Sequence, residues 1–346
     1  MNLISALIAS FALSFIMTPL FIALGWRFKV LDYPKADKVH SDPTPLLGGV
    51  SIFLTFFFFI ILFSDKVTGV YRYLFLSGAI LFVSGLIDDI RPVSALKRLL
   101  IQILASSILI YGGAYFTFLP NTPWGNIGEV ALTFLWLVGI TNAFNYLDGL
   151  NGLASGVGII NAFFFMVFAL LTSQPVLAFV LVVFMGSSAG FFPYNFLKGR
   201  IFLGNSGSAW MGYTLAGLAV IGEWALKSPV DLVIPILIFG VPIYDMMNTT
   251  AVRILDKKAT NMIDLLAYRG KDHFHHRLSQ TGLGRQGAVF FIYVISIMLG
   301  LNGLLLQMSQ GAANIVIILA ISTLFFVLIS SLIIPKPKHK KREVRK

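Results

Sequence analysis

The chain of 346 residues contains no cysteine, and only 12% of its residues are charged. The lack of cysteine excludes a disulfide framework, cysteine-ligated zinc, an iron–sulfur cluster and a thiol nucleophile. A typical soluble domain has about 25% charged residues, whereas here hydrophobic residues make up 57% and the mean hydropathy is +0.84. This composition excludes a water-soluble enzyme and a disordered chain, and it predicts an all-α polytopic membrane protein.

Eleven apolar runs predict transmembrane helices, because a bilayer core needs roughly 20 apolar residues per helix. The runs lie at approximately 3–25, 48–63, 72–87, 96–118, 126–147, 153–171, 175–192, 206–224, 229–248, 286–308 and 312–334. The second and third runs are short, and each can extend by a neighbouring turn. We expect one transmembrane catalytic domain over residues 1–334 and a basic cytoplasmic tail over 335–346.

An odd number of spans places the two termini on opposite sides of the membrane. With the N-terminus outside, the cytoplasmic loops and the tail hold all of the 26 lysines and arginines except Lys66, Arg72 and Lys227. The positive-inside rule therefore predicts an N-out, C-in orientation. The net charge of +11 then faces anionic lipid head groups, so membrane lipids are expected partners and nucleic acid is not.

The polar residues that do not set the orientation gather in the cytoplasmic loops. Ionisable groups are costly at a membrane boundary and are usually functional there. The third predicted span ends in Asp88 and Asp89, whose adjacent carboxylates are tolerated when a cation or a proton lies between them. Arg98 begins the next span and is a candidate ligand for a phosphate. The alternative is a solvated loop with a surface aspartate pair.

The fifth predicted span ends in a segment rich in side-chain amides. Asn142 and Asn145 lie three residues apart and so share a helix face. Asp148 and the glycine after it are typical of a helix stop, and Asn151 belongs to the following turn. These four amide and carboxylate side chains favour a site that binds a sugar or a base, or that supplies oxygen ligands to a metal. Helix capping and turn chemistry is the alternative.

A turn rich in glycine and serine, Gly204 to Ser208, opens the eighth predicted span. Such a turn at a helix N-terminus presents free backbone N–H groups to an anion. The alternative is an ordinary N-cap, in which Asn205 or Ser206 satisfies the first turn of the helix.

The long loop after the ninth predicted span carries a histidine cluster made of His273, His275, His276 and Arg277. A metal and a diphosphate are both possible ligands. The further ligands that a zinc site requires are not evident in the chain, whereas imidazolium and guanidinium groups both donate to oxyanions. Phosphate is therefore favoured over metal, with a solvated basic loop as the alternative. Asp245 is a further carboxylate near the cytoplasmic end of the ninth span.

The segment from Lys38 to Gly49 precedes the second predicted span. Its two prolines favour an extended conformation, and its two final glycines permit close approach of another backbone. Lys38 and His40 are candidates for contact with a substrate, and a plain loop is the alternative.

The order of these motifs, all on cytoplasmic loops, resembles the polyprenyl-phosphate N-acetylhexosamine-1-phosphate transferases. The resemblance runs from Lys38 to about Arg285. The span count and the His-Phe-His-His-Arg sequence are similar to the branch that uses UDP-GlcNAc and undecaprenyl phosphate. The phospho-MurNAc-pentapeptide branch, which usually has ten spans and a different histidine cluster, is the runner-up.

The resemblance implies a reaction at the bacterial inner (plasma) membrane, with the active site on the cytoplasmic face. The lipid phosphate attacks the β-phosphorus of UDP-GlcNAc, UMP leaves, and undecaprenyl-diphosphate-GlcNAc forms. The family uses Mg²⁺, or Mn²⁺ in its place. Catalysis of this kind consists mostly of positioning and of neutralising charge, which fits polar motifs at the level of the lipid head groups.

The resemblance also implies residue roles. Asp88 and Asp89 match the catalytic aspartate pair, one of which deprotonates the lipid phosphate or holds it through the metal. Asn145 and Asn205 match positions linked to the metal. The candidate substrate-binding residues are Lys38, His40, Arg98, Asn142, Asp148, Asn151, His273, His275, His276 and Arg277.

Two positions depart from the family's pattern. The family normally has Gly-Asp where this chain has Gly204 and Asn205, and it more often has aspartate at the position of Asn151. An amide oxygen ligates Mg²⁺ but brings no negative charge. We therefore expect weaker metal binding and a low activity that the substitution Asn205→Asp raises.

Two other classes of protein compete with this interpretation. A secondary transporter would place its ionisable groups near the bilayer midplane and show internal repeats, neither of which the sequence indicates. A lipid-binding scaffold would leave the aspartate pair and the histidine cluster without a role. The sequence leaves open which glycopolymer the product feeds and whether the protein forms a homodimer.

Overall fold

The computed structural model describes residues 2–34, 42–197, 199–224, 232–256 and 273–309, with short pieces at 316–317 and 320–323. Within these residues the fold is helical, as the composition predicted. A pair of two-residue strands, β1 (Leu31–Asp32) and β2 (Thr44–Pro45), runs antiparallel with Leu31 opposite Pro45. Lys38, His40, residues 335–346 and most of the eleventh predicted span lie outside the described residues.

The helices follow the predicted apolar runs. They are α1 (Leu3–Arg27), α2 (Gly48–Leu62), α3 (Val70–Ile90), α4 (Ala95–Tyr111), α5 (Pro123–Leu147), α6 (Leu153–Leu171), α7 (Pro175–Phe196), α8 (Gly204–Ile221), α9 (Val233–Ile238), α10 (Gly240–Leu255), α12 (Phe274–Leu278) and α13 (Gly284–Met308), with the short turns η1 (Ser64–Lys66) and η3 (Ser279–Leu283). Among the described residues, α1, α3, α5, α6, α7 and α13 are long and apolar enough to span a membrane. The count of eleven spans and the orientation stay predictions.

Local sequence signals account for several helix starts. The side chain of Asn2 accepts a hydrogen bond from the backbone N–H of Ser5 (2.8 Å) and caps α1. Thr122 caps α5 in the same way, and Pro123 follows at the first helical position, where its missing N–H costs nothing. Gly152, with a φ of +79°, allows the sharp turn that precedes α6.

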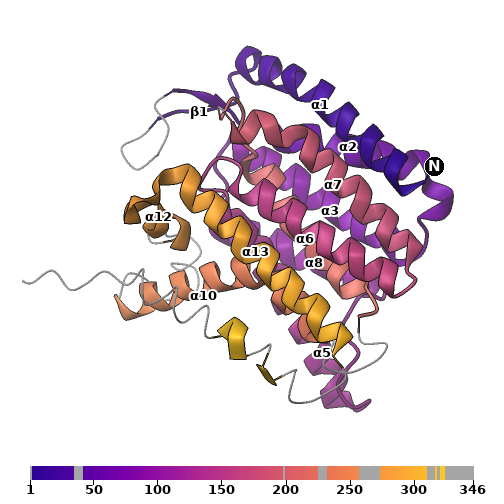
Figure 1. Ribbon diagram of the computed structural model, residues 1–346. Helices are drawn as coiled ribbons and strands as arrows, with labels where there is room; N and C mark the ends of the chain where they lie inside the picture. Colours follow the sequence, from indigo (N-terminus) through magenta and orange to yellow (C-terminus); the bar gives the residue numbers. More distant parts are fainter. Residues whose placement is uncertain are drawn as a thin grey trace, which may run out of the picture.

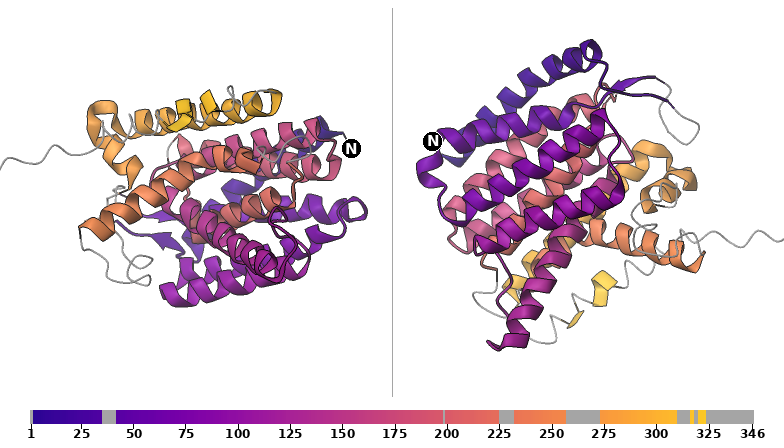
Figure 2. Two further views of the ribbon diagram at one scale, coloured as in Figure 1. Left: turned by 90° about the horizontal axis from the view of Figure 1, so that it is seen from below. Right: turned by 180° about the vertical axis from the view of Figure 1, so that it is seen from behind.

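The helices form a bundle in which α7 packs between α1 and α6, and α8 packs between α3 and α5 (Figure 1). Figure 2 shows α4 beside α3 on the opposite face, and α13 crosses over α6. The core combines aliphatic side chains with large aromatic ones, of which Phe56, Phe144, Phe184 and Trp210 are fully buried. Consecutive helices alternate in direction, so the ends of α1, α3, α5 and α7 meet the starts of α2, α4, α6 and α8 at one end of the bundle. We call this the site end.

The ninth predicted span, expected to be continuous over 229–248, is broken in the structure. Helix α9 stops at Ile238 and α10 starts at Gly240. Pro242 has no N–H to donate to the carbonyl of Ile238 four residues earlier, which ends the regular pattern. The side-chain amide of Asn161, when oriented as a donor, reaches that carbonyl at 3.0 Å. The break lets α10 leave the bundle axis and carry its far end past the site end (Figure 1).

Candidate functional site

The two adjacent aspartates at the end of α3 point in different directions. Asp88 accepts hydrogen bonds from Arg98 Nη1 (3.2 Å) and from the backbone N–H of Val93 (2.6 Å). Asp89 turns instead toward the start of α8. Each of the two carboxylates therefore has its own donors within the protein. Consecutive residues of a helix differ by about 100° in direction, which explains the divergence.

Asp89 caps α8 from another helix. Its carboxylate accepts the backbone N–H groups of Asn205 (2.7 Å) and Ser206 (3.0 Å), together with the Ser206 hydroxyl (2.7 Å) and the Asn205 side-chain amide (3.1 Å). The N–H groups of the glycine-rich turn do face an anion, as predicted, but the anion is this carboxylate. An N-cap supplied by Asn205 or Ser206 is not what the structure contains. Asp89 thus joins α3 to α8.

Small residues let the helices come close enough for this contact. A Cβ on Gly85 would lie 2.6 Å from the Cα of Ser206, and one on Gly49 would lie 2.4 Å from the backbone nitrogen of Gly207. The start of α2 also bonds to the residue before α8, since the N–H of Gly49 donates to the carbonyl of Leu203 (2.9 Å). The glycines of the predicted entrance segment therefore fix the turn that Asp89 caps.

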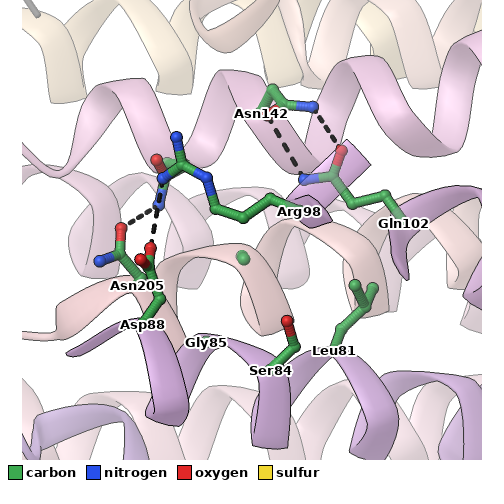
Figure 3. A pocket seen from close by; sticks show the side chains of 10 residues that line it. Leu81, Ser84, Gly85, Asp88, Arg98, Gln102, Asn142 and Asn205 are labelled. Carbon is green, nitrogen blue, oxygen red and sulfur yellow. Dashed lines mark hydrogen bonds and ion pairs between the residues drawn. The ribbon is translucent and has the colours of Figure 1, made fainter. Parts of the chain in front are cut away.

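A polar pocket opens between α3, α4, α5 and α8 at the site end (Figure 3). Its lining residues are Leu81, Ser84, Gly85, Asp88, Arg98, Gln102, Asn142, Asn145, Asn205 and Ala209. The pocket thus brings together five of the predicted site residues from four helices. With a volume of about 30 Å³, it has room for an ion and its waters rather than for a sugar nucleotide.

Side-chain amides line one wall of the pocket. Asn145 donates through Nδ2 to Oδ1 of Asn205 (3.0 Å) and to the hydroxyl of Ser208 (3.0 Å). Asn142 and Gln102 form a reciprocal amide pair, with Asn142 Nδ2 donating to Gln102 Oε1 at 2.8 Å and Gln102 Nε2 donating back at 3.4 Å. This pair is visible in Figure 3. The predicted shared face of Asn142 and Asn145 is confirmed by their common pocket.

Asp148 follows α5 as its C-terminal cap residue, as predicted for a helix stop. Burial raises the pKa of its carboxyl well above the usual range, and the carboxylates of Asp89 and Asp32 raise it further, against a hydrogen bond from the backbone of Gly204. Asn151 lies apart from the pocket, exposed and against Gly199, whose Cβ would lie 2.4 Å from its Nδ2. The four polar side chains of this segment therefore do not all converge.

The start of the histidine cluster is held by α10. His273 Nδ1 lies 3.1 Å from Oδ2 of Asp245, and the backbone N–H of Phe274 donates to Oδ1 of the same carboxylate (2.6 Å). On its other side, His273 Nε2 lies 3.2 Å from Nη2 of Arg253. Both ring nitrogens of His273 thus have partners within the protein.

The cluster reaches the Asp148 turn through His275. A Cβ on Gly149 would lie 2.3 Å from His275 Nε2, so the imidazole rests directly against that glycine. His275 is fully buried, and neither ring nitrogen has a hydrogen-bond partner. Burial lowers the pKa of His275 to about 3, despite the nearby Asp245 carboxylate, so the ring is neutral. His276 and Arg277 follow in α12, half-buried, with the His276 ring 4.4 Å from that of His275.

Several residues of the site were not singled out from the sequence. Gln102 lies one helical turn after Arg98, and Arg253 lies two turns after Asp245, with Thr249 between them on the same face. Spacings of four residues were the available signal, because they align side chains along a helix. In the part of the chain that is described, no group of three or more histidine, aspartate or glutamate side chains is arranged to hold a metal.

Comparison with known proteins identifies one family and several relatives that are similar in sequence. The model of the family described as Glycosyl transferase family 4 matches residues 71–223. The chain is 31% identical over 316 residues to the probable undecaprenyl-phosphate N-acetylglucosaminyl 1-phosphate transferase of Bacillus subtilis strain 168. This alignment covers 88% of this chain and 85% of the relative. It is 31% identical over 332 residues to the decaprenyl-phosphate N-acetylglucosaminephosphotransferase of Mycobacterium leprae, covering 85% of this chain and 79% of the relative.

A more distant relative is the phospho-N-acetylmuramoyl-pentapeptide-transferase of Clostridium botulinum, which is 25% identical over 326 residues, 87% of this chain and 95% of its own. The residues that match the family model include Asp88, Arg98, Asn145 and Asn205, which line the pocket. These findings confirm the resemblance seen in the motifs: the chain belongs to glycosyl transferase family 4.

Proposed function

We propose that the protein transfers GlcNAc-1-phosphate from UDP-GlcNAc to undecaprenyl phosphate, giving undecaprenyl-diphosphate-GlcNAc and UMP. An oxygen of the lipid phosphate forms a bond to the β-phosphorus, and the bond from that phosphorus to the oxygen of the leaving UMP breaks. The name of the Bacillus subtilis relative states N-acetylglucosaminyl 1-phosphate transfer with undecaprenyl phosphate, and the name of the Mycobacterium leprae relative states N-acetylglucosaminephosphotransferase activity with decaprenyl phosphate. The site lies at the cytoplasmic face of a bacterial plasma membrane, where the lipid phosphate and the soluble nucleotide meet.

The observation that carries this proposal is the convergence at the site end. Asp88, Arg98, Asn142 and Asn145 come from three helices and line one pocket. A cation, a carboxylate and amide groups beside a membrane surface are suited to a phosphate that cannot leave the bilayer. The two anionic substrates repel each other, so the site must position them and neutralise charge, which is the main requirement of phosphoryl transfer.

The contacts favour different roles for the two aspartates. Asp88 faces the pocket, and we assign to it the contact with the lipid phosphate and the acceptance of its proton. Arg98 is positioned to exchange its bond with Asp88 for one with phosphate, since a guanidinium donates equally well to both oxyanions. Asp89 has four hydrogen bonds to α8 and positions Asn205 instead of reacting.

The donor set of the pocket fits a hard divalent cation such as Mg²⁺ or Mn²⁺. The Asp88 carboxylate and the amide oxygens of Asn145 and Asn205 line the same pocket, and Mg²⁺ in proteins commonly uses one or two carboxylates with substrate phosphates. Asn145 and Asn205 would hold the ion, with the Asp88 carboxylate beside it. When bound, it supplies charge neutralisation on the diphosphate and polarises the bond to UMP. With a single carboxylate, we expect binding to depend on the diphosphate.

Donor choice separates this proposal from its nearest alternative. The relative that uses a muramoyl-pentapeptide donor is 25% identical, against 31% for the N-acetylglucosaminyl relatives. A secondary transporter is disfavoured, because the pocket residues Asp88 and Arg98 and the Asp245–His273 pair lie at the site end of the bundle and not at its midpoint.

Purified full-length protein in nanodiscs, given UDP-GlcNAc, undecaprenyl phosphate and Mg²⁺, tests the proposal. We expect UMP release that requires the lipid, and a lipid product of the mass of undecaprenyl-diphosphate-GlcNAc. UDP-GalNAc and UDP-MurNAc-pentapeptide serve as competing donors. Preference for the pentapeptide donor would support the alternative transferase, and no lipid-dependent UMP release from any donor would rule out both.

A further inference from the structure

An aromatic side chain lies between the two halves of the site, which are the polar pocket and the histidine cluster with its partners on α10. Tyr146 follows Asn145 at the end of α5, and its ring contacts two residues from other elements. The His273 ring lies with its centroid 5.0 Å away at an angle of 53°, and the guanidinium carbon of Arg253 lies 5.6 Å from the Tyr146 centroid. The same side chain therefore touches both α10 and the start of α12.

Arg253 is a buried cation, only 1% exposed. A charged group taken out of water is costly unless it has partners. On its own side of the site, Arg253 lies 3.2 Å from His273, which in turn lies 3.1 Å from Asp245. The face of an aromatic ring attracts a cation, and does so more strongly when the cation is desolvated. Tyr146 supplies this face from α5.

Helix α5 also packs directly against α10. His275 rests against Gly149 without a hydrogen bond from either ring nitrogen. The polar contacts of His273 run to α10 and not to α5. The Tyr146 ring, next to Asn145 in the sequence, therefore relates the histidine cluster to α5 alongside the contact of His275 with Gly149.

We propose that Tyr146 is a positioning residue, which holds Arg253 and His273 in register with the pocket so that the donor diphosphate meets both halves of the site. This inference rests on the proposed function and deepens it. Tyr146 need not touch the substrate, since its effect passes through the two residues against its ring. The aromatic face is the feature required, so phenylalanine substitutes for it and leucine does not.

Kinetics of three variants test this role. Tyr146→Leu should raise the KM for UDP-GlcNAc about tenfold, equivalent to about 1.4 kcal/mol, with the KM for undecaprenyl phosphate and kcat within twofold of the wild type. Tyr146→Phe should stay within twofold in all three constants. Tyr73→Leu is the matched control, because Tyr73 contacts the Tyr111 ring (6.1 Å between centroids) and Gly112 at the other end of the bundle.

The proposal is overturned if Tyr146→Leu leaves the KM for UDP-GlcNAc unchanged, or if Tyr146→Phe is equally defective. It is also overturned if Tyr146→Leu and Tyr73→Leu weaken both substrates alike, because that would indicate a general loss of packing.

A second measurement does not depend on activity. The chain has no cysteine, so the paired substitutions Leu135→Cys on α5 and Leu255→Cys on α10, both at exposed positions, give two unique sites for spin labels. In the full-length protein, Tyr146→Leu should broaden the distance distribution between the labels, and Tyr146→Phe and Tyr73→Leu should not. An unchanged distribution in Tyr146→Leu overturns the proposal. The two proposals can also fail separately. If the wild type shows no transfer activity but Tyr146→Leu still broadens the distance distribution, the proposed function is refuted and the positioning role is supported.

Discussion

The unequal surroundings of Asp88 and Asp89 lead to a prediction about their asparagine variants. Asp89 receives four hydrogen bonds from the start of α8, at 2.7 to 3.1 Å. In Asp89→Asn, one oxygen can keep two of these donors, and the new NH₂ group faces the other two. Asp88 instead receives one bond from Arg98 and one from Val93, and an asparagine oxygen can keep the latter.

The contacts set the expected magnitudes. A hydrogen bond to a charged group contributes about 1.5–3 kcal/mol, so losing two of them in Asp89→Asn lowers the free energy of unfolding by roughly 3–6 kcal/mol. At about 2–4 °C per kcal/mol, the melting temperature falls by roughly 10 °C. In Asp88→Asn the lost ion pair is partly exposed on its Arg98 side, and the cost is about 1 kcal/mol.

The assay is thermal unfolding of both variants in the same detergent, followed by transfer measured well below each midpoint. We expect Asp88→Asn to unfold within a few degrees of the wild type and to lose at least a hundredfold in kcat, since it removes the proton acceptor. Asp89→Asn should unfold much earlier and retain measurable transfer at low temperature. Equal stability of the two variants, or a lasting activity in Asp88→Asn, would refute the assignment of roles.

Three further outcomes follow from the geometry. Asn205→Asp sets a carboxylate against Asp89 where the amide now donates at 3.1 Å, so it should raise Mg²⁺ affinity and Mg²⁺-dependent transfer; an unchanged Mg²⁺ titration would contradict this. His275 has a folded-state pKa of about 3 against 6.5 when unfolded, so the unfolded chain binds the extra proton and the melting temperature should fall as pH drops from 6.5 toward 3. His275→Gln should lessen that fall, and an identical profile would count against it. Gly149→Ala places a Cβ 2.3 Å from His275 Nε2 and should raise the KM for UDP-GlcNAc about tenfold. The control Gly139→Ala should not, because its Cβ would meet only Met246, at 3.7 Å. Equal kinetics of the two variants would refute the steric argument.

Much of the fold was predictable because apolar length and end signals are local properties of the sequence. The run at 153–171 matches α6 residue for residue, and the stop at Asp148 lies where the helix ends. The break at Phe239 was signalled by Pro242, which cannot donate to Ile238, but a window of average hydropathy does not register a missing N–H. Local rules thus predicted the helices better than their interruption.

The candidate site was predictable as a set of residues and less so as a set of contacts. The motifs predicted that Asp88, Asn145 and Asn205 lie together, and the pocket joins them. The capping of α8 by Asp89 depends on how α3 packs beside α8, which no spacing along the chain encodes. Arg253 was overlooked because its partner His273 is distant in sequence, so its burial could not be inferred from α10 alone.

The most direct test of the account follows the β-phosphorus of the donor. UDP-GlcNAc carrying ³²P at the β-phosphate is incubated with the protein, undecaprenyl phosphate and Mg²⁺, and the label is separated into lipid and aqueous fractions. Transfer of GlcNAc-1-phosphate predicts that the label enters the lipid together with the sugar and that unlabelled UMP is released. Label that stays in a water-soluble nucleotide while the sugar enters the lipid would contradict the account.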